Sequence, residues 1–158
     1  METLTKEKTE KIISLLNDLV EINNDRVQGY ERAISETEEE DLIYLFTNMA
    51  ARSRSYRSDL GKEITSLGGE PTEGTKNSGK LFRAWMDIKA ALTGKNRKEI
   101  LNSCEFGEDA ALDVYKEVLA DKDKVLTEDL RKLIQMEHDE ILVDHNRIKA
   151  LRDLGKNL

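Results

Sequence analysis

Residues 68–79 read GGEPTEGTKNSG and form the one long stretch of this sequence that is rich in helix-breaking residues. The stretch holds the single proline, Pro71, and four of the nine glycines. Proline interrupts a helix, and glycine is favoured just past the end of one. We therefore expect a long connection here, with regular structure on both sides of it.

Apolar residues before and after this stretch recur every three or four positions, the spacing of an amphipathic helix. The pattern predicts two long helices before it, at 5–36 and 39–67, with Thr5 capping the first. After it we expect a short helix at 79–93 and two long ones at 97–121 and 127–154. A length of 158 residues and a charged fraction of 36% fit one helical domain, 1–158.

The lengths of the links between these helices predict how they are connected. The first and last links are short, which favours two antiparallel hairpins. The middle link is long enough to cross the length of a bundle. We expect an all-α, ferritin-like antiparallel four-helix bundle with a long crossover that contains the short fifth helix. An up-down bundle with the short helix capping one end is the alternative.

Charge and cysteine content argue against several classes of protein. The chain has 25 Lys and Arg against 32 Asp and Glu, a net charge of −7, so we expect no binding to nucleic acid or to an anionic membrane surface. No apolar run approaches the ~18 residues of a membrane span. The charged first residues do not read as a signal peptide. A single Cys excludes a disulfide framework. We expect a cytoplasmic protein.

Several polar residues fall on the apolar stripes of the predicted helices. A projection at about 100° per residue places one or two of them at the centre of each stripe, near the middle of its helix. Because the middles of antiparallel helices share one level, we predict a buried polar layer. Its members are Asn23, Ser53, Glu108, Glu137 and Asp144, with Tyr56 and Arg57 close by.

Buried carboxylates need a partner, because taking a charge out of water costs several kcal/mol. One possible partner is a divalent metal, iron or manganese, held by Glu108, Glu137 and Asp144, with Glu105 and His145 as further candidates. The other is Arg57, in a network with Tyr30, Tyr56, Tyr115 and water.

The di-iron pattern of ferritin-like bundles requires Glu-x-x-His on two helices. Helix 39–67 has neither Glu nor His at the level of the layer, and both histidines, His138 and His145, lie on helix 127–154. A complete ferroxidase centre is therefore not expected, and a protein without enzymatic activity is favoured.

Five stretches carry a family resemblance: 19–33, 67–71, 85–94, 104–112 followed by Tyr115, and 145–151. Together they resemble small bacterial ferritin-like proteins of unknown function, related in fold to stress-induced ferritin-like proteins. The resemblance implies a ferritin-like bundle without an established activity. It implies polar positions of interest at Asp25, Tyr30, Glu105, Glu108, Asp109 and His145. Two residues depart from the family pattern: Arg26 stands where Gly is expected, and Asn146 stands where Asp is expected.

These observations lead to three functional hypotheses. The first is a cytoplasmic ferritin-like bundle with a degenerate metal centre, acting without catalysis in stress response or as an assembly module, and forming a homodimer or higher oligomer. The second is a metal-binding or oxidase-like protein that uses the mid-bundle carboxylates. The third is a partner-binding module that docks through Phe82 and Trp85 of the short helix.

Overall fold

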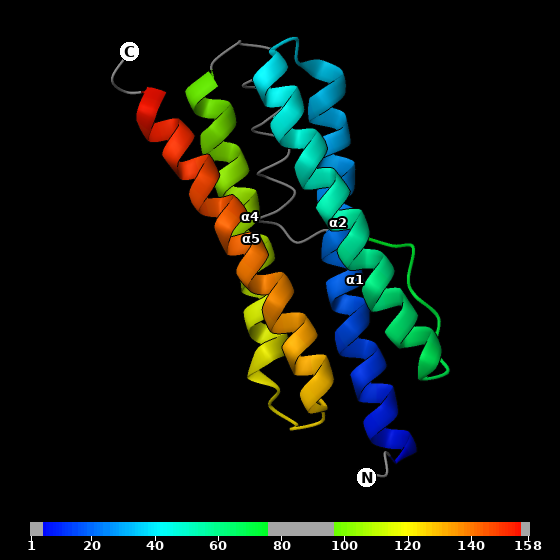
Figure 1. Cartoon of the computed structure of the whole chain (residues 1–158). Coiled ribbons are helices and arrows are strands. Elements are labelled where there is room, and N and C mark those ends of the chain that lie inside the picture. Colours follow the sequence, from blue (N-terminus) through cyan, green and yellow to red (C-terminus); the bar gives the residue numbers. More distant parts are fainter. Residues whose placement is uncertain (1–4, 76–96, 156–158) are drawn as a thin grey trace.

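A computed structural model describes residues 5–75 and 97–155. These residues form four α-helices: α1 (Lys6–Glu36), α2 (Glu40–Ser66), α4 (Arg97–Ala120) and α5 (Glu128–Gly155) (Figure 1). The predicted all-α architecture of four long helices is confirmed, and each helix begins and ends within one residue of its expected range. The predicted short helix at 79–93, with Phe82 and Trp85, lies outside the described residues.

Local signals in the sequence account for the helix ends. The Thr5 side chain accepts a hydrogen bond from the backbone N–H of Lys8 at 3.1 Å, which caps α1. After α2, Gly68 adopts a φ of 88°, a left-handed conformation that glycine adopts without strain. Between α4 and α5, the Asp121 carboxylate accepts hydrogen bonds from the backbone N–H groups of Val125 and Leu126 and fixes the turn.

The helices form two hairpins, α1 with α2 and α4 with α5, which meet along α1 and α4. Arg97 at the start of α4 forms an ion pair with Asp41 at the start of α2, so these two helices run in the same direction. The chain that follows α2 turns back along α1. There Asn17 donates a hydrogen bond to the carbonyl of Glu70, and Asn24 donates one to that of Gly74.

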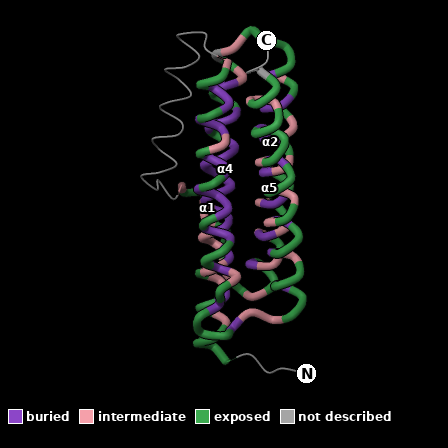
Figure 2. Tube along the Cα trace, turned by 90° about the vertical axis from the view of Figure 1, so that its left-hand side faces the viewer, coloured by how far each residue is buried: buried purple, intermediate pink, exposed green. Residues whose placement is uncertain are grey.

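The buried residues lie on the inner sides of the four helices (Figure 2). Their apolar side chains form two clusters. Burial of these side chains is the main stabilising contribution in a bundle of this kind. One cluster draws on residues 12–22, 56–64, 110–118 and 130–141. The other draws on residues 30–33, 42–50 and 100–104 and on Ile148.

The helices are too polar to cross a lipid bilayer. In the two described segments, none is both long enough and apolar enough to do so.

Candidate functional site

A layer of polar side chains lies between the two apolar clusters. The structure buries the five residues that were placed on the stripe centres, each no more than 1% exposed: Asn23, Ser53, Glu108, Glu137 and Asp144. Tyr56 is also buried. Arg57 is only half-buried, and its guanidinium donates a hydrogen bond to the side-chain oxygen of Asn24 at 3.1 Å. Arg57 therefore does not provide the cation for the buried acids.

The cation that meets Glu108 is Arg26. The Nη2 group of Arg26 lies 2.8 Å from Oε1 and 2.9 Å from Oε2 of Glu108, and both side chains are 1% exposed. The hydroxyl of Tyr30 donates a further, short hydrogen bond to Oε1 of Glu108. The Arg26 guanidinium also lies over the Tyr30 ring, 5.9 Å from its centroid. These three polar side chains meet at the α1–α4 contact, where Nη2 of Arg26 bonds to Glu108 while its Nε and Nη1 atoms are buried without a hydrogen-bond partner among the described residues.

The groups around Glu108 keep one protonation state near neutral pH. Burial alone would lower the pKa of Arg26, but the negative charge of Glu108 and its hydrogen bonds raise that pKa above its ordinary value. Burial, and then the charge of Glu108, raise the pKa of Tyr30 well above 10. The same two causes raise the pKa of the buried Cys104 thiol well above 9. Around Glu108 there is thus one permanent cation and no group ready to act as a nucleophile.

A second hydrogen-bonded chain links α1, α4 and α5. The amide of Asn23 donates to the Tyr115 hydroxyl at 2.9 Å, and that hydroxyl donates to Oε1 of Glu137 at 2.7 Å. Burial raises the pKa of Glu137 from 4.5 to about 8; the Tyr115 hydrogen bond opposes this shift, and the charges of Asp59 and Glu140 add to it. Glu137 is therefore mostly protonated and neutral at pH 7.

Asp144 and Ser53 take separate partners. The Asp144 carboxylate pairs with Arg52 of α2, and Arg147 lies 3.8 Å from it. The Ser53 hydroxyl donates to the Met49 carbonyl of its own helix at 3.0 Å. The three carboxylates predicted to converge, those of Glu108, Glu137 and Asp144, thus bond to different groups.

Glu105 and His145 lie away from the layer, at the outer seam between α4 and α5. The Nε2 atom of His145 is 2.8 Å from Oδ1 of Asp109 and 3.6 Å from Oε1 of Glu105. Arg152 pairs with Glu105 and donates a hydrogen bond to Asn102 at 3.2 Å. These groups form a partly exposed ion-pair cluster at the rim, so they do not join the buried acids as ligands.

The donor set does not fit the iron or manganese site of a ferritin-like bundle. Within residues 5–75 and 97–155, no three or more His, Cys, Asp or Glu side chains are grouped so that they could hold a metal ion. The chemical reason is visible at Glu108, where the guanidinium of Arg26 engages both carboxylate oxygens that a metal would need.

Sequence reasoning missed Arg26 as a buried residue. Arg26 follows Asn23 by three positions and precedes Tyr30 by four, so all three share one face of α1. A long cationic side chain at the edge of an apolar stripe is ordinarily assigned to solvent. One signal in the sequence could have found it, namely the departure of Arg26 from the family pattern. The resemblance implies glycine at this position, and glycine has no side chain to bury.

A family model described as a domain of unknown function (DUF2383) matches residues 11–121. The chain belongs to this family. The DUF2383 match includes all of α2 and α4 and most of α1, and therefore Arg26, Tyr30 and Glu108; it ends before α5. A search of curated proteins finds no match to this sequence.

Proposed function

We propose that this protein is a cytoplasmic, non-catalytic ferritin-like bundle in which an internal ion pair stands where related folds hold a metal. One observation carries the proposal: Arg26 binds both oxygens of Glu108 within the buried layer. A permanent cation at this position offsets the buried carboxylate charge, which is the electrostatic role of a metal. Unlike a metal ion, the guanidinium of Arg26 cannot change its coordination or its redox state.

The protonation states of the layer support a structural role. General acid–base catalysis needs a group that exchanges its proton within reach of a substrate. Tyr30, Tyr115 and Cys104 are fully buried, and their pKa values lie far above neutral pH. Glu137 titrates closer to neutrality but is buried beneath Tyr115. The layer instead ties the two hairpins in one register, a known use of buried polar groups.

The ferritin-like connectivity is part of the same proposal. Parallel α2 and α4 require the intervening chain to return along the bundle, and residues 69–74 already run back beside α1. An up-down bundle would place the start of α4 at the end of α2, far from Asp41. A role in stress response or in assembly rests on the resemblance to small bacterial ferritin-like proteins.

Metal titration combined with an oxidase assay tests the proposal. Adding ferrous iron or manganese should leave the melting temperature unchanged, and the protein should not accelerate oxygen or peroxide consumption by ferrous iron. The variant Arg26→Gln, which frees Glu108, serves as a matched comparison. Saturable stabilisation of the wild-type protein by either metal, or catalytic turnover of oxygen or peroxide, would contradict the proposal.

A metal-binding or oxidase-like protein is the second candidate. It is favoured by one buried oxygen each of Glu137 and Asp144 that has no hydrogen-bond partner within the described residues. Loss of metal-induced stabilisation in Glu137→Gln, but not in Glu128→Gln on the exposed first turn of α5, would support this candidate.

A further inference from the structure

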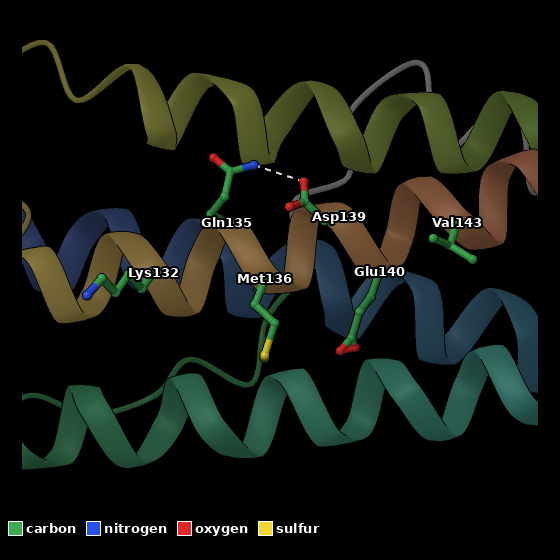
Figure 3. A pocket seen from close by; sticks show the side chains of 6 residues that line it. All are labelled: Lys132, Gln135, Met136, Asp139, Glu140 and Val143. Atoms are coloured by element: carbon green, nitrogen blue, oxygen red, sulfur yellow. Dashed lines mark hydrogen bonds between the residues drawn. The ribbon is translucent and has the colours of Figure 1, made fainter.

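The outer face of α5 is apolar and exposed. Met136, Val143 and Leu154 lie on this face and are 46%, 55% and 65% exposed. Met136 and Val143 border a shallow pocket on the helix surface, seen from outside in Figure 3. The pocket is lined by Lys132, Gln135, Met136, Asp139, Glu140 and Val143.

The spacing on this face is that of a helix that packs on another helix. Met136, Val143 and the exposed Ala150 are seven residues apart, so they form a straight row, as the apolar positions of a coiled coil do. The row is separate from the buried stripe of α5, which runs through Ile134, Ile141 and Ile148. The helix therefore has two apolar faces, and the bundle covers one of them.

We propose that the second face is covered by α5 of a second copy of this chain, packed antiparallel with Val143 on the two-fold axis. In this arrangement Met136 of each copy packs on Ala150 of the other, because these residues stand seven positions before and seven after Val143. A two-fold interface requires a surface that complements itself in this way.

The charges beside the row match the same axis. Glu140 stands three residues before Val143 and Arg147 four after it, so each Glu140 meets Arg147 of the other copy. Both side chains lie at the edge of α5 that faces α2. Figure 3 shows Glu140 directed toward α2, and Arg147 lies beside Asp144, which pairs with Arg52 of α2. When two α5 helices pack antiparallel across a two-fold axis, this edge of one helix lies against the same edge of the other. The opposite charges of Glu140 and Arg147 can therefore pair between the copies.

Two further pairs of polar positions also meet without conflict. Lys132 stands eleven residues before Val143, and Asp153 stands ten after it. Lys132 of each copy therefore meets Asp153 of the other, with opposite charges, at each end of the contact. Asp139 stands opposite the neutral Asn146, three residues after Val143. No like charges face each other among these pairs. Charge complementarity thus favours a second copy of the chain, since any other partner would need this pattern by coincidence.

The size of the contact sets the expected strength. One pair of helices makes a smaller contact than the roughly 1,200–2,000 Å² of a standard interface. We therefore expect a reversible dimer whose population rises with concentration. The proposal is independent of the Arg26–Glu108 ion pair, because that pair is buried inside the bundle, where α1 meets α4.

Cysteine crosslinking of the full chain tests the axis directly, because the single natural thiol, Cys104, is buried. Val143→Cys places two thiols next to each other across the two-fold axis and should form a disulfide-linked dimer rapidly under mild oxidation. Leu142→Cys is the matched control: Leu142 is 40% exposed but lies off the row, so it should crosslink slowly. Equal crosslinking rates for the two variants would overturn the proposal.

Sedimentation equilibrium with charge reversal tests the pairing. Glu140→Arg and Arg147→Glu should each weaken the dimer at least tenfold, and the double variant should recover most of the affinity. Val143→Glu should yield a monomer with an unchanged melting temperature, since the site is exposed. A wild-type protein that stays monomeric into the high micromolar range, or a double variant no better than either single one, would overturn the proposal.

Discussion

The Arg26–Glu108 pair lends itself to a double-mutant cycle. The single variants are Arg26→Met and Glu108→Leu, and the double variant carries both. Among the described residues, Arg26→Met leaves the Glu108 carboxylate with the Tyr30 hydroxyl, and Glu108→Leu leaves the guanidinium with the face of the Tyr30 ring. The double variant removes both charges and fills the space with apolar groups. Because Tyr30 loses its acceptor whenever Glu108 is changed, the cycle is repeated with Tyr30→Phe.

The structure sets the expected magnitudes. Both side chains are 1% exposed, so either single variant leaves a buried charge without its partner. Breaking a buried pair in this way costs about 3–5 kcal/mol. For a chain of this size, 1 kcal/mol corresponds to roughly 2–4 °C in melting temperature, so each single variant should melt about 6–20 °C lower. The double variant should be as stable as the wild-type protein, or more stable by about 1–4 kcal/mol.

Urea unfolding at pH 7, followed by circular dichroism, measures these differences. The coupling free energy should be several kcal/mol, with the double variant far more stable than the sum of the single losses predicts. If the two single losses simply add to within about 0.5 kcal/mol, the reasoning is refuted, because independent sites behave in that way.

Three further variants probe other contacts of the described residues. In the folded protein the pKa of Glu137 is raised from 4.5 to about 8, so protonated Glu137 contributes stability at low pH. This contribution to the free energy of unfolding is lost as the pH rises from 4.5 to about 8. Unfolding measured from pH 5 to 8 should therefore show up to ~4 kcal/mol less stability at pH 8, and Glu137→Gln should remove that slope. Tyr115→Phe leaves Oε1 of Glu137 without its donor and should cost about 1–3 kcal/mol in urea unfolding at pH 7. Asp121→Ala removes the acceptor of two backbone N–H groups and the partner of Arg131, and we expect it to lower the free energy of unfolding by about 1–2 kcal/mol in thermal unfolding. Asp121→Asn should keep most of the wild-type stability.

The helices and the buried layer were within reach of sequence reasoning because both depend on position around a single helix. The row from Ile12 to Tyr30 shows the 3.6-residue period without knowledge of any neighbour. The same projection places Asn23 and Glu108 at the centres of their stripes, and the structure buries both.

The partners within the layer were out of reach because they depend on which helices lie side by side. Arg57 and Arg26 both lie near a stripe, and projection does not tell which of them faces α4. The structure places α4 beside α1, so Arg26 reaches Glu108, and Arg57 bonds to Asn24 instead. Convergence of Glu137 and Asp144 was overestimated for the same reason, since Tyr115 and Arg52 engage them from different helices.

Elemental analysis of the native protein, purified without chelators, tests most directly whether an ion pair stands in place of a metal. We predict that iron, manganese and zinc are each far below one atom per chain in the wild-type protein, and that exposure to these metals followed by dialysis leaves the metal content unchanged. Near-stoichiometric iron or manganese that survives dialysis would contradict this prediction, because the bundle would then hold a metal and the Arg26–Glu108 ion pair would not stand in its place.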